Sequence, residues 1–323
     1  MIYKQRSMPK KLIGLAALLQ RLDPTQELYR KVEEDFRNLK AGFGGEQNSD
    51  KHLLEFKPLY PHAILHDVCL KHDGVYFQMD SILITPAFIL IIEVKNIGGK
   101  LIFKSNPDRF VRQNDSGGKK AMKSPVAEVE RKKFFLQQWL TQTEIHVPVK
   151  GVVALAYSNE LELEIDPSIP ILFTYQLPNY LYSLSVEQNQ LNAAEIQKVT
   201  RKMIKDHKEY NPFPMMVSME ISRTAILSGV ICPACNNRGM QWMKRRWRCR
   251  KCDYFGGDCH LRAIADWHYL ISDKITNREF RGFVCLKDRN VARRLLAKPD
   301  FEMKGNRRNA FYKMRIKSES VSK

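Results

Sequence analysis

The feature that most constrains the fold is an apolar stretch over residues 81–94, interrupted near its middle by Thr85 and Pro86. At about 14 residues it is too short for a membrane-spanning helix, which needs about 20 apolar residues. Pro86 followed by Ala87 favours a turn, so the stretch predicts two buried strands joined in a hairpin. The chain is therefore expected to carry a buried sheet and no membrane span.

The surrounding segments predict an α/β domain. Glycines at positions 42, 44 and 45 are expected to end an N-terminal helical segment, and a new helix to run from about Glu46 to Phe56. Apolar runs predict strands at residues 62–71, 75–85, 88–95 and 149–157. A polar loop is expected across 104–123, and Ser124-Pro125 is a typical helix start. The resulting order is helix, three strands, helix, strand.

Acidic side chains and a lysine meet at the end of this hairpin. A two-residue turn at 86–87 places Asp80 opposite Glu93, and Gln78 opposite Lys95, in an antiparallel ladder. Glu93 and Lys95 share a face because they are two residues apart on a strand. Opposed carboxylates need a cation, and Mg²⁺ prefers such oxygen ligands, while a nearby lysine can stabilise charge on a phosphate. The simpler alternative is a salt bridge that closes the sheet.

These residues resemble the NERD (nuclease-related) domain of the PD-(D/E)xK nuclease superfamily, whose core order is αβββαβ. The motifs are Gly44-Gly45-Glu46, Gln78-x-Asp80 and Ile92-Glu93-Val94-Lys95-Asn96 with Gly98-Gly99 following, and the resemblance covers about residues 40–160. It implies that Asp80 and Glu93 hold Mg²⁺ or Mn²⁺ and that Lys95 is the catalytic lysine. It also implies that Glu46 is an accessory acid and Gln78 a supporting polar residue.

One position departs from the pattern of these domains. Where they often carry Pro followed three residues later by Gln, this chain has Pro125-Val126-Ala127-Glu128. Glu128 is either an additional acid near the site or an acid favoured in the first turn by the helix dipole. Because activity does not follow from fold, the alternative is a non-catalytic DNA-binding or regulatory protein with a silent nuclease fold.

Four of the seven cysteines form two C-x₂-C pairs separated by 13 residues, which is typical of a zinc ribbon. They are Cys232, Cys235, Cys249 and Cys252. Four thiolates would hold one structural Zn²⁺ with no open position for chemistry, whereas the alternative is a redox pair. Cys259-His260 lies close by and offers a substitute ligand, although we expect the four cysteines.

The positive charge is concentrated in the last third of the chain. Of a formal net charge of +18, the segment from Ile231 onward carries 23 of the 53 Lys and Arg but 9 of the 35 Asp and Glu. Such a balance indicates a polyanionic partner. Residues 261–316 read as three helices and a hairpin turning at Gly305-Asn306, which resembles a winged helix.

The winged-helix resemblance implies a set of nucleic-acid contacts. Arg289, Asn290, Arg293 and Arg294 would lie on the recognition helix, and Lys304, Arg307 and Arg308 would contact phosphates from the wing. A solvated basic helix with a flexible tail is one alternative. A protein partner with an acidic surface is another, and competition by DNA would separate it from DNA binding.

We therefore expect an α/β protein with a restriction-endonuclease-like αβββαβ core, followed by a zinc ribbon and a small helical winged-helix-like domain. The expected divisions are an N-terminal helical segment (1–40), the NERD domain (41–160), a helical extension and linker (161–229), the ribbon (230–259) and the winged-helix-like module (260–318). The expected activity is Mg²⁺-dependent hydrolysis of DNA, with a homodimer as an option. Residues 12–19 are apolar but lack a signal-peptide cleavage site, so we expect a cytoplasmic protein.

Overall fold

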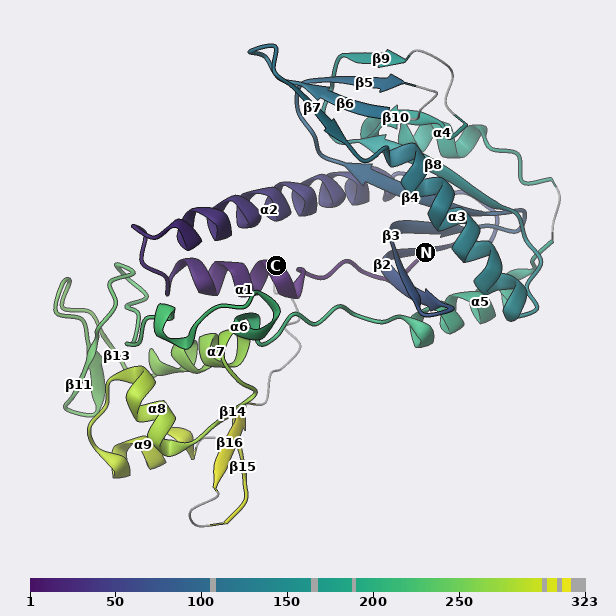
Figure 1. Ribbon diagram of the computed structural model, residues 1–323. Coiled ribbons are helices and arrows are strands. Elements are labelled where there is room, and N and C mark those ends of the chain that lie inside the picture. The colour runs from purple at the N-terminus through teal and green to yellow at the C-terminus, as the bar shows by residue number, and fades with distance from the viewer. Residues whose placement is uncertain (105–108, 164–167, 188–189, 298–300, 307–309, 315–323) are drawn as a thin grey trace. The chain divides into compact units, whose positions relative to one another are not determined.

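The computed structural model describes residues 1–323 except 105–108, 164–167, 188–189, 298–300, 307–309 and 315–323 (Figure 1). The chain divides into two compact units. Unit 1 consists of Met1–Met8 and Leu39–Glu209, and unit 2 of Pro9–Asn38 and Tyr210–Lys323. Residues 1–40, treated as one segment from the sequence, are thus shared between the two units.

Unit 1 is built on a six-stranded sheet with the order β1-β2-β3-β4-β8-β10. Its strands are β1 (Ile2–Lys4), β2 (Ala63–His72), β3 (Val75–Ile84), β4 (Ile89–Lys95), β8 (Val149–Leu155) and β10 (Ile171–Phe173). Strands β2, β3 and β4 are antiparallel, whereas β8 pairs with β4 in parallel. With α2 (Glu27–Leu53) and α3 (Pro125–Gln142), the order α2-β2-β3-β4-α3-β8 is the expected αβββαβ core.

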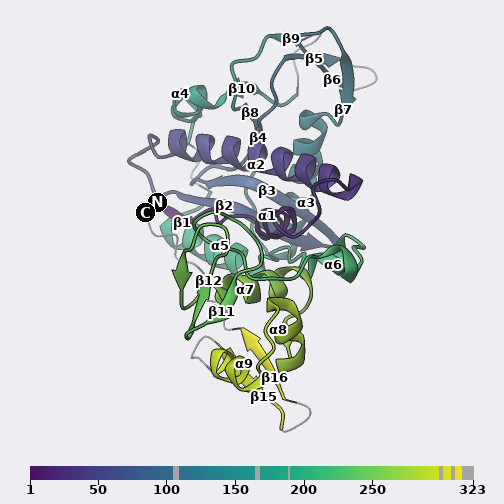
Figure 2. The same cartoon turned by 90° about the vertical axis from the view of Figure 1, so that its left-hand side faces the viewer.

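Helices cover both faces of this sheet (Figures 1 and 2). On one face, α3 and α5 (Ala193–Asp206) bury Leu136 and Met203 against the apolar side chains of β2 to β4. On the other face, the end of α2 and α4 (Leu177–Ser183), joined to β10 by the 3₁₀ turn η1 (Thr174–Gln176), bury Leu53 and Leu181. Burial on both sides explains why β4 reads as a continuous apolar run.

Helix α2 corrects the expected break at residues 42–45, because it runs without interruption through these glycines. A helical glycine costs only about 1 kcal/mol relative to alanine, which tertiary packing easily exceeds. Gly45 also permits a close approach: a Cβ there would lie 2.5 Å from Asn96 Cβ. Asn96 Nδ2 donates to the Ala41 carbonyl at 2.6 Å, so the end of β4 is tied to α2.

The polar loop expected across 104–123 is also corrected. It contains β6 (Arg109–Gln113) and β7 (Lys119–Met122), which join β5 (Lys100–Lys104) and β9 (Leu161–Leu163) in a sheet of order β7-β6-β5-β9. The Phe103 and Phe110 rings are buried with their centroids 4.7 Å apart. Few apolar residues suffice here because β7 is exposed and only part of this sheet is covered.

Unit 2 joins the first helix to the C-terminal part of the chain. Its helices are α1 (Lys10–Leu19), α6 (Met215–Ser218), η2 (Arg223–Ala225), α7 (His260–Leu270), α8 (Asn277–Val284) and α9 (Arg289–Leu296). The fully buried Arg21 donates from Nε to Asp266 Oδ2 at 2.7 Å, and from Nη1 to the Leu227 and Gly229 carbonyls at 3.0 Å each. This paired, buried cation makes the segment that follows α1 part of the unit 2 core.

Two small sheets complete unit 2. The first, in the order β11-β12-β13, consists of β11 (Gln241–Met243), β12 (Arg246–Arg248) and β13 (Phe255–Gly256). The second, in the order β14-β16-β15, consists of β14 (Lys274–Ile275), β15 (Phe301–Lys304) and β16 (Phe311–Met314). β15 and β16 form the expected antiparallel hairpin. Across the described residues, none of the helices combines the length and apolarity that a membrane crossing requires.

Candidate active site

The β3–β4 hairpin has the register that its turn predicts. Ser81 pairs with Ile92 and Ile84 with Ile89. Asp80 and Glu93 therefore lie just beyond the ladder pair that is farthest from the turn. There the strands separate, and the Val94 N–H donates to Asp80 Oδ2 at 2.8 Å. The two carboxylates are thus held together at the end of a rigid, buried hairpin.

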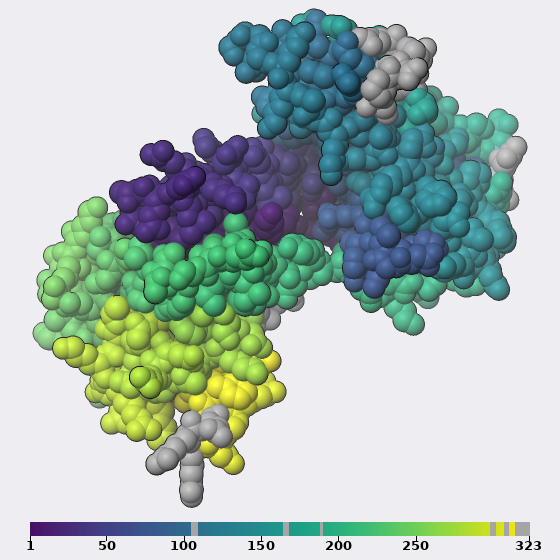
Figure 3. Space-filling view, in the orientation of Figure 1, coloured from purple at the N-terminus to yellow at the C-terminus, as the bar shows by residue number. Residues whose placement is uncertain are grey.

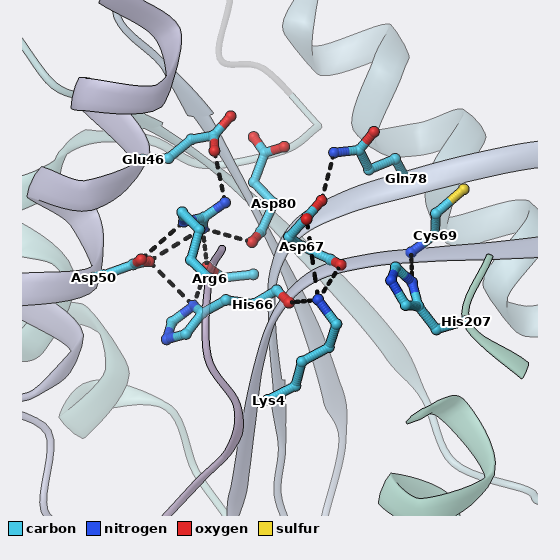
Figure 4. A network of polar contacts seen from close by, with 11 residues as sticks. Lys4, Arg6, Glu46, Asp50, His66, Asp67, Cys69, Gln78, Asp80 and His207 are labelled. Carbon is cyan, nitrogen blue, oxygen red and sulfur yellow. Dashed lines mark hydrogen bonds and ion pairs between the residues drawn. The ribbon is translucent and has the colours of Figure 1, made fainter. Parts of the chain in front are cut away.

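Gln78 is placed differently from the expected pairing with Lys95. The β3–β4 ladder ends before it, and Gln78 pairs instead with Cys69 on β2. Its side chain donates from Nε2 to Asp67 Oδ1 at 2.7 Å (Figure 4). Asp67 has a positive φ of 53°, which interrupts the regular β2 geometry beside Asp80. Gln78 therefore borders the site but is oriented by Asp67.

Glu93 is nearly fully buried, and two lysines neutralise it. Lys95 Nζ donates to Glu93 Oε1 at 2.9 Å, and Lys132 Nζ donates to Oε2. Burial alone would raise the pKa of Glu93, but Lys132 and Lys95 outweigh it and hold that pKa below the usual value. The carboxylate is therefore charged at neutral pH.

Glu128 lies in the site through its contact with Lys95. Its Oε2 accepts from Lys95 Nζ at 2.6 Å. Burial lowers the pKa of Lys95, but Glu93 and Glu128 outweigh this effect and raise it above the usual value. Lys95 is therefore a permanent cation between two carboxylates, and the residue that departs from the family pattern is also a contact of the central lysine.

The pKa values of Asp80 and Glu46 are shifted upward, in the opposite direction to that of Glu93. Burial and the charge of Glu93 raise the pKa of Asp80 to about 6. Burial and Asp80 likewise raise the pKa of Glu46 to about 7. Two acids whose pKa values are raised in this way form an environment that a further cation would stabilise.

Arg6 connects these acids from outside the hairpin (Figure 4). Its side chain is only 4% exposed, and its Nη1 donates to Glu46 Oε2 at 2.6 Å. Its Nε donates to Asp50 Oδ2 at 2.8 Å, and Nη2 donates to the Asp80 carbonyl at 2.7 Å and Ser81 Oγ at 3.2 Å. Arg6 thus fixes α2 to β3 where the two acids lie.

Sequence reasoning missed Arg6 and Lys132, for different reasons. Arg6 lies 40 residues before Glu46, and no local pattern indicates that the two meet. Lys132 follows Glu128 by four residues on α3, so helical spacing gave a usable signal that both share one face.

These side chains border a hollow of about 340 Å³, here called the acidic hollow. It is lined by Tyr76, Phe77, Gln78, Asp80, Glu93, Lys95, Glu128, Arg131 and Lys132. The carboxylates of Asp80 and Glu93 are hard oxygen donors of the kind that Mg²⁺ and Mn²⁺ prefer, so the donor set fits such an ion. Both lysines at Glu93 would have to share that carboxylate with it.

The four cysteines of the C-x₂-C pairs form a second cluster, in unit 2. The ligand atoms of Cys232, Cys235, Cys249 and Cys252 all lie within 4.8 Å of one another. Two of the Sγ–Sγ distances are 3.6 Å and 3.5 Å, close to the roughly 3.8 Å between thiolates at 2.3 Å from a tetrahedral zinc. His260 lies outside this cluster and accepts a hydrogen bond at Nδ1 from Trp247 Nε1 at 3.2 Å. The cluster can hold a structural metal ion in a zinc ribbon.

The predicted nucleic-acid contacts lie mostly on one exposed helix face. Val291, Ala292, Leu295 and Leu296 of α9 are buried, whereas Arg289, Asn290, Arg293 and Arg294 are exposed. Lys304 is exposed at the end of β15 and forms an ion pair with Glu302 at 3.3 Å. Arg307 and Arg308 lie outside the described residues.

The fold and the acidic hollow define a class: an αβββαβ domain with two acids and a lysine at the end of its central hairpin, as in PD-(D/E)xK nucleases. The family model of the nuclease-related domain, NERD, matches residues 41–156, from within α2 to just beyond β8. The segment that matches the NERD model contains all the residues that line the acidic hollow. Searches of the curated proteins and of the solved structures returned no match.

Proposed function

We propose that this protein is a metal-dependent nuclease that hydrolyses phosphodiester bonds in DNA. The observation that carries the proposal is the acidic hollow, where Asp80, Glu93 and Lys95 converge within a NERD domain. Asp80 and Glu93 would hold Mg²⁺ or Mn²⁺, which supplies charge neutralisation and an activated water when bound. The four cysteines would hold one structural Zn²⁺.

Other side chains in and around the hollow have parts that their contacts support. Lys95 keeps its proton and so stabilises negative charge on the phosphate rather than acting as a base. Glu46, with a pKa of about 7, is suited to take up a proton near neutral pH. Gln78 holds Asp67 beside the hollow, and Arg6 positions Glu46 against β3.

Unit 2 would position the enzyme on DNA. The order of α7, β14, α8, α9, β15 and β16 supports a winged-helix-like module with α9 as the recognition helix. The exposed cations of α9 and Lys304 would contact DNA. Phosphate contacts by these side chains imply an affinity that falls steeply with salt. We place the protein in the cytoplasm, where cysteines persist as thiolates for a metal.

The test is cleavage of supercoiled, linear duplex and single-stranded DNA by the purified protein with Mg²⁺, with Mn²⁺ and with EDTA. We expect metal-dependent cleavage that Glu93→Gln or Asp80→Ala lowers by at least about a hundredfold, with DNA binding retained. Glu130→Gln is a matched control, because Glu130 is on α3, is 42% exposed and pairs with Lys133 outside the hollow. Full cleavage by Glu93→Gln would reject this active site.

A second candidate is a DNA-binding or regulatory protein with a silent nuclease fold. The observation that favours it is the engagement of both Glu93 oxygens by lysines, which a metal ion would have to share. Intact DNA under every metal condition, with tight salt-sensitive binding, would support this candidate.

A further inference from the structure

An exposed aromatic ring stands at the edge of the acidic hollow. Tyr76 on β3 lines the hollow together with Asp80, yet it is 55% exposed, whereas its neighbour Phe77 is 2% exposed. Figure 3 shows the blue end of the β2–β3 hairpin at the surface beside the teal atoms of α3. Core packing accounts for Phe77 but gives no reason for an aromatic side chain at position 76.

One cation contacts this ring, and a second cation lines the same hollow. Lys71, its cross-strand partner on β2, has Nζ 5.2 Å from the centre of the Tyr76 ring. Arg131 on α3 lines the same hollow, with its guanidinium 4.9 Å from the centre of the Phe135 ring. Phe135 in turn stacks on Phe77 at 5.7 Å. Arg131 is therefore an exposed cation supported by packed aromatic rings.

An exposed ring in a hollow that also contains an exposed cation suits one part of a nucleic acid in particular. Exposed aromatic rings stack on bases, and neighbouring cations follow the phosphates. Within a duplex each base is already stacked on its neighbours, so a protein ring reaches only a base that is unpaired or flipped out. Tyr76 precedes Asp80 by four strand residues, a span of about 13 Å that a few nucleotides cover.

We infer that the acidic hollow takes single-stranded nucleic acid, with an unpaired base stacked on Tyr76 and a phosphate held by Arg131. This inference rests on the proposed nuclease function and names its substrate class. The competing role for Tyr76 is purely structural: its ring covers the Lys71 side chain and stiffens the hairpin. If Tyr76 stacks on a base, removal of its ring weakens binding of single strands more than binding of duplexes. If its role is only structural, removal of the ring affects both probes alike.

The experiment measures binding by the full chain without added Mg²⁺ or Mn²⁺, so that no strand is cut. The probes are a single-stranded DNA octamer with a central 2-aminopurine, whose fluorescence reports stacking, and the blunt duplex of the same sequence. The variants are Tyr76→Ala, Tyr76→Phe and Arg131→Gln. Tyr175→Ala is the matched control, since Tyr175 is 56% exposed in unit 1 and lies outside the hollow.

We expect Tyr76→Ala to weaken single-strand binding about tenfold and to reduce the quenching of 2-aminopurine. Duplex binding should change by less than about twofold, because no base is available there for stacking. Tyr76→Phe and Tyr175→Ala should bind both probes like the unmodified protein. Arg131→Gln should weaken binding of the single-stranded probe. An equal loss on both probes, an unchanged Tyr76→Ala, or a loss in Tyr76→Phe as large as in Tyr76→Ala would each overturn the inference.

This readout requires no turnover, so its failure differs from failure of the proposed function. If the protein cleaves DNA but Tyr76→Ala has no effect on binding, the nuclease proposal stands and the stacking site is rejected. If the protein does not cleave DNA but Tyr76→Ala weakens single-strand binding, the result supports a single-strand binding site in a silent nuclease fold.

Discussion

At the residue scale, the acids in and beside the hollow differ in their pKa values because their neighbours differ. Two lysines hold Glu93 ionised, whereas burial and the charge of a neighbouring acid raise the pKa values of Asp80 and Glu46. The domain therefore carries one acid with a lowered pKa beside two acids with raised pKa values. That asymmetry is a property of the folded chain, because the three residue types have similar pKa values in isolation.

Glu46 makes the stability of the metal-free protein depend on pH in a specific direction. Its pKa rises from 4.5 to about 7 on folding, so between these values the native state binds more protons than the unfolded state. Stability from this group is complete below pH 4.5 and is lost as pH rises toward 7. Relative to Glu46→Gln, the unmodified protein should lose about 2 to 3 kcal/mol across this range, measured by urea unfolding.

The comparison with Glu46→Gln cancels the titration of groups that do not interact with Glu46. Glu34→Gln, an exposed change on the same helix that leaves Glu46 in place, serves as the control and should keep the pH dependence of the unmodified protein. A difference between Glu46→Gln and the unmodified protein that stays constant from pH 4.5 to 7 would contradict the raised pKa.

At the element scale, α2 shows how packing overrides local propensity. Its glycine-containing stretch predicts a break, yet the helix continues, and one glycine admits the end of β4. Neighbouring positions in this stretch therefore have opposite constraints: Gly44 has no atom within 4 Å of an added Cβ, whereas at Gly45 the added Cβ would meet Asn96.

This contrast predicts opposite effects of the same substitution. Gly44→Ala should stabilise the protein by about 0.5 to 1 kcal/mol, because alanine is the better helix former and meets no obstacle. Gly45→Ala should destabilise it by about 1 to 3 kcal/mol through overpacking against Asn96. Urea unfolding followed by circular dichroism measures both changes, and equal effects would contradict the observed packing.

At the scale of the whole molecule, two units have separate sources of stability. Unit 1 has an extensive apolar core on both faces of its sheet. In unit 2, the ribbon depends on the four cysteines, of which Cys232 and Cys249 are buried. Metal binding at such a cluster is coupled to folding, so loss of the metal should affect unit 2 first.

We therefore expect Cys249→Ser to abolish the bound zinc, about one ion per chain in the unmodified protein, and to lower the unfolding temperature of unit 2 alone. Zinc content by atomic absorption and a two-step thermal melt measure these effects. Cys285→Ser is the control, because Cys285 is exposed in the same unit and lies outside the cluster. Full zinc content in Cys249→Ser would rule out the four-cysteine site.

The sequence by itself determined features that depend on short-range periodicity. Strand alternation and the turn at residues 86–87 predicted the hairpin register, and the spacing of four cysteines predicted their cluster. Pro125 after Ser124 marked the start of α3, where Ser124 Oγ accepts from Ala127 N–H at 3.4 Å. Each of these depends on neighbours within about 20 residues, whose relative geometry the backbone limits strongly.

Only the tertiary structure decided the features that depend on distant segments. Arg6 reaches Glu46 and β3 across 40 and 74 residues, and Arg21 meets Asp266 across 245. The continuity of α2 and the strands β6 and β7 likewise follow from what packs against them. Such contacts are selected by burial and charge compensation in the folded chain, and no local pattern in the sequence encodes which distant residues will meet.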